Sequence, residues 1–156
     1  MNYWAKLIIF LVLNFGALAI GSYFTGNGIT SSWYQNLQKA PWSPPGFVFG
    51  IAWFTIMICF SFFMANITTG NKLISINILL IIYAAQWLLN VLWNPLFFKF
   101  QLPHIALIDI ILLFMVVGIF LFLGFKQSLA NGLLVLPYFI WLAIAVSLNA
   151  YIVVKN

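Results

Sequence analysis

Five long apolar runs dominate the 156-residue chain and leave little room for any other architecture. They lie near residues 4–24, 46–67, 73–98, 103–125 and 129–154. Each is long enough for a helix to cross the hydrocarbon core of a bilayer, which is about 30 Å thick and needs roughly 20 helical residues. The apolar residues are continuous along each run and do not alternate with polar ones. We therefore expect membrane-spanning helices and not barrel strands.

The composition excludes a water-soluble domain. Charged residues make up only 4% of the chain, whereas soluble domains carry roughly a quarter. Because the links after the second, third and fourth runs are short, we predict one all-α membrane domain, residues 1–156. Five helices form its bundle, and a long structured loop, residues 25–45, joins the first two. The first run could instead be a signal peptide, since Ala17-Leu18-Ala19 resembles a cleavage site, although the apolar run continues past that site.

Positive charge is spread along the chain and identifies no charged partner. All six cations are lysines, and there is no basic cluster of the kind that binds nucleic acid. Three lysines fall at each predicted membrane surface: Lys6, Lys72 and Lys126 on one side, and Lys39, Lys99 and Lys155 on the other. The positive-inside rule gives a tie, so the orientation stays open.

Ordinary catalytic groups are scarce. With one Asp, one His, one Cys and no Glu, the chain has no carboxylate pair, Ser-His-Asp triad or cluster of metal ligands. Asp109 falls inside the fourth predicted helix, where acids usually face the bundle interior with a partner. It could bind a ligand or relay protons, but a hydrogen bond to a neighbouring helix is favoured. His104 is expected at the membrane interface, although a lone His can also ligate haem iron.

The third predicted helix carries a polar face deep in the membrane. Its residues recur at spacings of three and four and therefore share one side of the helix: Tyr83, Gln86, Asn90 and Trp93. Amides in hydrocarbon need partners from protein or from a cavity. They either form hydrogen bonds between helices or make the polar edge of a ligand pocket. The neighbouring indole favours the pocket.

The second and fifth predicted helices each carry a deep Trp beside small residues. On the second, the residues that share one face are Gly46, Gly50, Trp53 and Met57. On the fifth, they are Trp141, Ala145 and Leu148, and Pro137 can kink the helix and free a carbonyl. Small residues can let helices pack closely, or they can leave space above a flat ring. Three such helices together favour a cavity for a large, flat, apolar ligand.

The loop 25–45 is too long and too aromatic for a simple connector. Loops of about twenty residues in compact proteins are usually lids, binding segments or disordered, and its aromatic and proline content argues against disorder. Ser32-Trp33-Tyr34-Gln35 fits a capping box, so we expect a short helix there. The prolines that follow it restrict the backbone on the way into the second helix. A stiff loop presenting Trp33, Tyr34 and Trp42 is either a lid over the bundle or an anchor at the membrane surface.

Three motifs resemble those of the translocator protein family, also called tryptophan-rich sensory proteins or peripheral benzodiazepine receptors. WYQNLQKAPWSPP is similar to the family's loop motif, with Ala40 where Pro is usual. YAAQWLLNVLWNPLFF resembles its third-helix motif, and LPYFIWLAIAVSLN its fifth-helix motif, with Ile144 in place of a common Phe. Asp109 matches the family's fourth-helix acid. The resemblance covers nearly the whole chain.

The resemblance implies a homodimeric five-helix bundle whose pocket opens below the first loop, in a bacterial cell membrane. Its ligands would be flat apolar molecules, protoporphyrin IX or haem above all, with sterols and membrane lipids as further partners. The implied pocket residues are Tyr34, Trp53, Gln86, Asn90, Trp93, Trp141, Ala145 and Leu148, to which the spacing and loop arguments add Trp42, Gly46 and Gly50. Trp53 and Trp141 match the pair implicated in porphyrin breakdown by bacterial members, and a loose sterol motif falls on Leu148, Tyr151 and Lys155.

Three functions stay open at this point. The first is a membrane receptor or sensor that binds tetrapyrroles and can also move them. The second is an enzyme that degrades porphyrin with light and oxygen, in which Trp53 and Trp141 are oxidised beside the ligand. The third is a sterol- or lipid-responsive scaffold that acts through a partner protein. No resident cofactor and no metal is expected for any of them.

Overall fold

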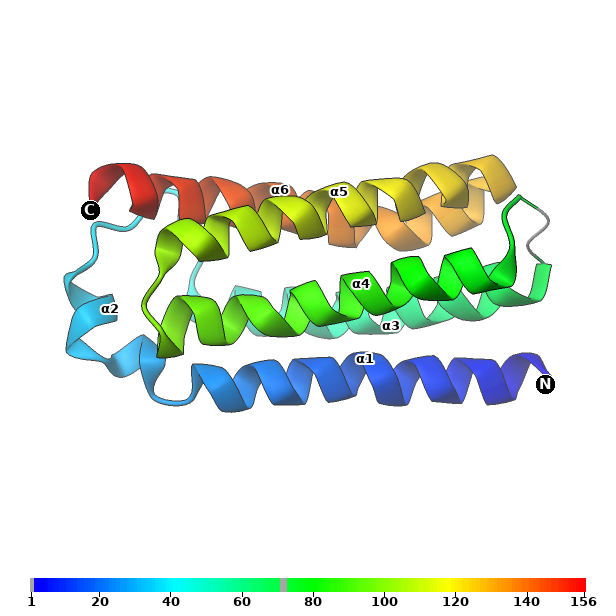
Figure 1. The fold of residues 1–156 in the computed structure, drawn as a ribbon, viewed down its shortest axis with the longest axis horizontal. Coiled ribbons are helices and arrows are strands. Elements are labelled where there is room, and N and C mark those ends of the chain that lie inside the picture. Colours follow the sequence, from blue (N-terminus) through cyan, green and yellow to red (C-terminus); the bar gives the residue numbers. More distant parts are fainter. Residues whose placement is uncertain (1, 71–72) are drawn as a thin grey trace.

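A computed structural model describes residues 2–70 and 73–156 (Figure 1). Its five long helices are α1 (Tyr3–Thr25), α3 (Gly46–Gly70), α4 (Ile76–Asn94), α5 (Pro103–Gln127) and α6 (Leu129–Lys155). All five are long and apolar enough to cross a membrane, which confirms the predicted all-α membrane fold. Lys72, which contributed to the charge count, lies outside the described residues.

The five helices pack as a closed ring in the order α1, α3, α6, α5, α4. α1 contacts α3 and α4, α6 contacts α3 and α5, and α4 contacts α5. Neighbouring helices run antiparallel except α1 and α4 (Figure 1), because a ring with an odd number of helices cannot alternate throughout. The short links hold α4, α5 and α6 together as consecutive neighbours, and the long loop lets α3 cross to the other side of α1.

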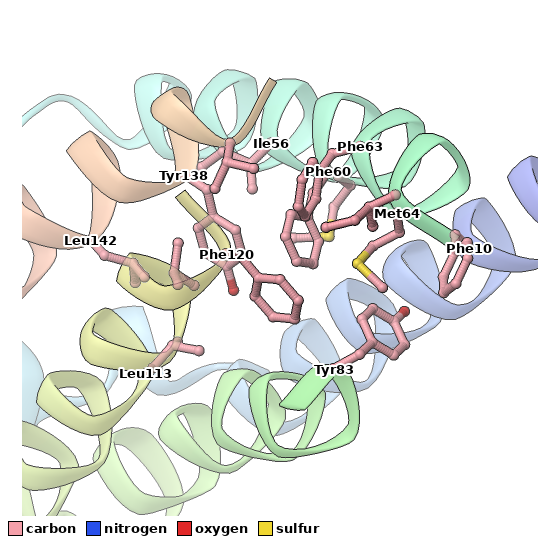
Figure 2. Close-up of a cluster of buried hydrophobic side chains, with 14 of the residues drawn as sticks. Phe10, Ile56, Phe60, Phe63, Met64, Tyr83, Leu113, Phe120, Tyr138 and Leu142 are labelled. Atoms are coloured by element: carbon pink, nitrogen blue, oxygen red, sulfur yellow. The ribbon is translucent and has the colours of Figure 1, made fainter. Parts of the chain in front are cut away.

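An aromatic cluster fills the middle of the ring. Phe60 of α3 lies at its centre, with ring centroids 5.4 Å from those of Phe120 and Tyr138, and 6.3 Å from that of Tyr83. These side chains come from α3, α4, α5 and α6 and point toward one another (Figure 2). Edge-to-face and offset pairs of this kind add to the stabilisation by close packing.

Hydrogen bonds connect α1, α3 and α4 inside the bundle. The Tyr83 hydroxyl of α4 donates to Asn14 Oδ1 of α1 at 2.8 Å, and Asn14 Nδ2 donates to Ser61 Oγ of α3 at 2.8 Å. Ser61 in turn donates to the carbonyl of Met57. Each of these buried polar groups is therefore satisfied inside the protein, as hydrocarbon requires.

The third membrane segment differs from the predicted 73–98. α4 begins at Ile76, where the Ser75 side chain accepts from the backbone N–H of Ile78, and ends at Asn94. A π-helical turn, η2, continues over Pro95–Lys99. Because Pro95 has no N–H, the regular ladder breaks there, and the wider turn carries Phe97 into the bundle.

The turn between α5 and α6 depends on glycine. Ser128 is the only residue between the two helices. A Cβ on Gly124 would stand 3.0 Å from the backbone oxygen of Asn131, and one on Gly132 would overlap the Phe125 ring. The two helices therefore approach closely at this end, which fixes α6 and the site residues that it carries.

Candidate functional site

The loop 25–45, which we call the lid, is structured and contains two short helical turns. η1 covers Gly28–Thr30 and α2 covers Ser32–Asn36. The predicted capping box is wrong by one residue: Ser31 is the cap, and its Oγ accepts from the Tyr34 N–H at 3.2 Å. The Gln35 amide donates to the carbonyl of Ile29 instead of closing the box.

The second half of the lid is attached to the end of α6. The indole N–H of Trp42 donates to Ser147 Oγ at 3.2 Å, and the Trp42 and Tyr151 rings meet edge to face at 5.4 Å. The backbone N–H of Gln38 donates to Asn156 Oδ1 at 2.9 Å. These contacts hold the lid across the end of the bundle (Figure 1). Tyr151, part of the sterol motif, is thus occupied by the lid.

Aromatic rings from the lid, α4 and η2 pack against one another beneath the lid. Phe97, which is buried, stacks on Trp93 at 4.9 Å and meets Trp33 at 5.6 Å and Tyr34 at 6.3 Å. We call these four residues and Phe98 the aromatic plug. Burial raises the pKa of the Tyr34 phenol. The Lys39 ammonium lies 4.6 Å from the centre of the Tyr34 ring and brings positive charge to the mouth of the bundle.

Trp93 is oriented by a residue that the sequence analysis did not single out. Its indole N–H donates to Asn149 Oδ1 of α6 at 3.1 Å, and Asn149 Nδ2 donates to the carbonyl of Pro103 at 2.9 Å. Asn149 is buried, so it joins α4, α5 and α6 below the plug. Asn149 lies one turn beyond Ala145 on the same face of the fifth predicted helix, and this spacing could have identified it from the sequence.

Below the plug, the predicted site residues Trp53 and Gln86 both contact Tyr138. The Trp53 ring packs edge to face on Tyr138 at 5.8 Å, and the Tyr138 hydroxyl accepts from Gln86 Nε2 at 2.8 Å. Trp141 lies one turn further along α6 and packs on Phe49 at 5.1 Å. Tyr138 was missed because a Tyr after a helix proline carries no distinctive pattern. It connects α3 and α4 at the level of the predicted pocket.

Several buried polar groups have no partner within the described part of the chain. Gln86 Oε1 and Asp109 Oδ2 are fully buried and accept no hydrogen bond. Asn90 is 8% exposed, and its side-chain amide makes no hydrogen bond to a described residue. The favoured hydrogen bond between Asp109 and a neighbouring helix is therefore not formed among the described residues. Unpaired polar groups are costly in hydrocarbon, so each of these three groups would gain a hydrogen bond from a ligand or water that reached it.

The glycines of the second-helix face do not pack against another helix. Gly46 and Gly50 are exposed, and a Cβ built on either meets no atom within 4 Å. Close helix packing therefore does not explain them, and space does lie beside them. Ala145 and Leu148 of α6 are partly buried. Lys155, the last member of the sterol motif, has its ammonium 6.0 Å from the centre of the Tyr151 ring.

The arrangement offers aromatic surface and amide hydrogen bonding, and the residues that the structure describes include no group of three potential metal ligands. It brings Trp53 and Gln86 together at Tyr138, with Trp141 one turn further along α6 against Phe49, and it places Tyr34 and Trp93 in the plug above them. Trp42 is 54% exposed and lies outside this group, against α6. A ligand under the lid must displace or separate the plug.

Comparisons with known proteins match this architecture. The family model described as TspO/MBR matches residues 8–155. A tryptophan-rich protein TspO of Chlorobaculum tepidum is 33% identical, over 97% of this chain and 98% of its own length. A tryptophan-rich sensory protein of Cereibacter sphaeroides is 30% identical, over 94% and 88%. The human translocator protein is 30% identical, over 83% and 78%.

Proposed function

The chain belongs to the TspO/MBR family, and we propose that it is a membrane receptor for a flat tetrapyrrole such as protoporphyrin IX or haem. The ligand binds within the bundle, below the lid. One observation supports the proposal: among the described residues, Gln86 Oε1 and the Asn90 amide have no hydrogen-bond partner, and they lie one turn apart on the α4 face that carries Trp93 of the plug. Large flat rings with a few polar atoms suit such a site.

Binding requires the aromatic plug to open. The macrocycle replaces the stacking that Phe97 and Tyr34 give to Trp93, so aromatic contact is exchanged and not lost. The pyrrole nitrogens or a ring substituent reach the Asn90 amide. The propionate carboxylates stay at the mouth, where the Lys39 ammonium can pair with them. The names of the relatives, which include sensory and translocator proteins, agree with a receptor that responds to its ligand.

Titration with protoporphyrin IX tests this proposal. The protein is reconstituted in lipid nanodiscs, and the Soret band of the porphyrin is followed, which avoids light absorption by the ligand at the Trp emission wavelength. We expect saturable binding that weakens about three- to tenfold in Asn90→Leu, the range for one lost hydrogen bond. Because the Asn90 amide makes no hydrogen bond to any described residue, this variant should fold normally.

A matched control is Asn77→Leu. Asn77 is exposed at the opposite end of the same helix, so this change repeats the chemistry away from the site. Binding that is not saturable, or that is equally tight in wild type, Asn90→Leu and Asn77→Leu, refutes a site at this face of α4.

A second candidate function is degradation of the porphyrin by light and oxygen. It is favoured by the position of two oxidisable indoles, Trp53 against Tyr138 and Trp141 against Phe49, beside the proposed site. Illuminated porphyrin loss is compared in Trp53→Phe, Trp141→Phe and the control Trp87→Phe, whose indole donates to the carbonyl of Leu13 on the flank of the bundle. Equal rates of porphyrin loss in all three variants would exclude Trp53 and Trp141 as the residues that carry this reaction. If the cellular response survives replacement of both Trp53 and Trp141, that result would instead support a scaffold that works through a partner protein.

A further inference from the structure

A groove between α3 and α6 opens on the flank of the bundle, away from the lid. Its volume is about 410 Å³, and its walls are mostly apolar, with Leu133, Leu136 and Ile140 of α6 on one side. Leu133 and Ile140 are about half exposed. In a membrane this groove faces lipid, so its occupant comes from the bilayer and not from water.

One wall of the groove carries a hydroxyl that bonds to none of the described residues. Thr55 of α3 lines it and is exposed. Hydroxyls inside apolar helices usually donate to the carbonyl one turn earlier, and Ser61 and Thr68 of the same helix do so at 2.6 and 2.7 Å. Thr55 makes no hydrogen bond to a described residue. Its O–H is therefore available to a molecule in the groove.

The opposite wall carries a carbonyl that has lost its partner. Pro137 lines the groove inside α6. A proline has no N–H, so the carbonyl of Leu133, four residues earlier and also in the groove, lacks its regular helical hydrogen bond. A backbone carbonyl without its regular partner thus belongs to a residue that lines the same groove as Thr55.

The floor of the groove adds a second donor. Trp141 is 7% exposed, and its indole N–H donates to no described residue. Among described residues, the fully buried side-chain atoms without a partner are Gln86 Oε1 and Asp109 Oδ2. The Trp141 nitrogen is not among them, and Trp141 lines the groove, so its indole N–H is the second candidate donor to a ligand there.

The depth of these groups narrows the class of ligand. Thr55 is nine residues from the start of α3, and Pro137 is eight residues from the start of α6, which runs the opposite way. Each is therefore about 12 Å or more from the nearer end of its helix. A phospholipid or a sterol keeps its polar group at the interface, so only methylene groups or a hydrocarbon skeleton would reach this level.

We propose that this groove binds the ring of an isoprenoid quinone. A quinone is neutral and dissolves in the bilayer core, and its carbonyl oxygens accept hydrogen bonds from Thr55 and Trp141. The prenyl tail lies along the leucine and isoleucine side chains of α6. In the reduced quinol, a ring hydroxyl donates to the free carbonyl of Leu133. This groove shares Trp141 with the proposed porphyrin reaction, but it opens on the flank of the bundle and quinone binding there does not require a tetrapyrrole below the lid.

Binding of decylubiquinone to the protein in lipid nanodiscs tests the proposal. Isothermal titration compares wild type with Thr55→Val, which keeps the shape of the side chain and removes its hydroxyl. We expect affinity to fall about three- to tenfold, as one hydrogen bond implies. The matched control is Thr68→Val, where the hydroxyl is already bonded to the carbonyl of Met64 outside the groove. This control should bind the quinone as the wild type does.

Decylbenzene, which has the same tail and no carbonyl, is the second probe. We expect it to bind more weakly than the quinone to the wild type and equally to wild type and Thr55→Val. If decylbenzene binds as tightly as decylubiquinone, or if Thr55→Val leaves quinone affinity unchanged, the groove is an ordinary lipid-facing surface and the proposal is overturned. Circular dichroism of Thr55→Val shows whether the variant is folded. Failure of the wild type to bind protoporphyrin would concern the tetrapyrrole site alone.

Discussion

Removing the Tyr138 hydroxyl should destabilise the bundle through Gln86. Tyr138 is 1% exposed and Gln86 is 2% exposed, and their hydrogen bond of 2.8 Å joins α4 to α6. Tyr138→Phe keeps the ring contacts with Phe60 and Trp53 and leaves Gln86 Nε2 without an acceptor. Because Gln86 Oε1 already has no partner among the described residues, the whole amide would then be unpaired within them.

The expected loss is about 1 kcal/mol. An unsatisfied buried polar group costs about 1–3 kcal/mol in soluble proteins, but hydrogen bonds between membrane helices average about 0.6 kcal/mol, with a maximum near 1.7, because the unfolded state in the membrane also finds partners. Burial deep in the aromatic core favours the upper half of that membrane range. Unfolding by SDS in mixed micelles, followed by circular dichroism, measures the loss.

A double-mutant cycle isolates this interaction. In the Gln86→Leu background no amide remains to be orphaned, so Tyr138→Phe should cost close to nothing. Tyr151→Phe is the control, since the Tyr151 hydroxyl makes no hydrogen bond to a described residue. An equal loss from Tyr138→Phe in both backgrounds would refute the reasoning, because the hydroxyl would then act independently of Gln86.

Three further predictions concern the helix turn and the lid. Gly124→Ala should lower stability in the same SDS assay by about 1–3 kcal/mol, because the new Cβ would stand 3.0 Å from the backbone of α6. The control Gly118→Ala should be tolerated, because its Cβ would make only an ordinary contact at 3.5 Å. Ser147→Ala removes the acceptor for Trp42 and should speed hydrogen exchange in the lid, with a loss of global stability of at most about 1 kcal/mol; unchanged exchange would contradict the attachment. Burial raises the pKa of Tyr34 above 10.0, so its contribution to lid closure is complete below pH 10 and is lost as the pH rises further. Limited proteolysis of the lid should increase above pH 10 in the wild type, and Tyr34→Phe should remove that pH dependence.

The membrane helices were predictable because hydrocarbon imposes one simple requirement on the chain. Every backbone polar group must be satisfied within its own segment, so a long apolar run specifies a helix. The amide face of α4 was predictable for a related reason. Gln86 and Asn90 recur at helical spacing, and amides at that depth must face the protein; both are indeed buried.

The details that sequence patterns missed depend on contacts between distant segments. Ser31 and Ser32 are equivalent as capping residues in the sequence, and only the structure identifies Ser31 as the cap of α2. The role of Asn149 requires Trp93 and Pro103 to come from two other helices. The π-helical turn follows from Pro95, but the resulting insertion of Phe97 below Trp33 and Tyr34 depends on where the lid lies.

A structure of the complex with protoporphyrin IX in lipid tests the central claim most directly. The account predicts that the macrocycle lies inside the ring of helices, next to Asn90 and Gln86, with Phe97 and Tyr34 moved from their present stacking positions. The lid should remain attached to α6 through Trp42. A porphyrin bound on the outer flank of the bundle, with the aromatic plug intact, would contradict the account.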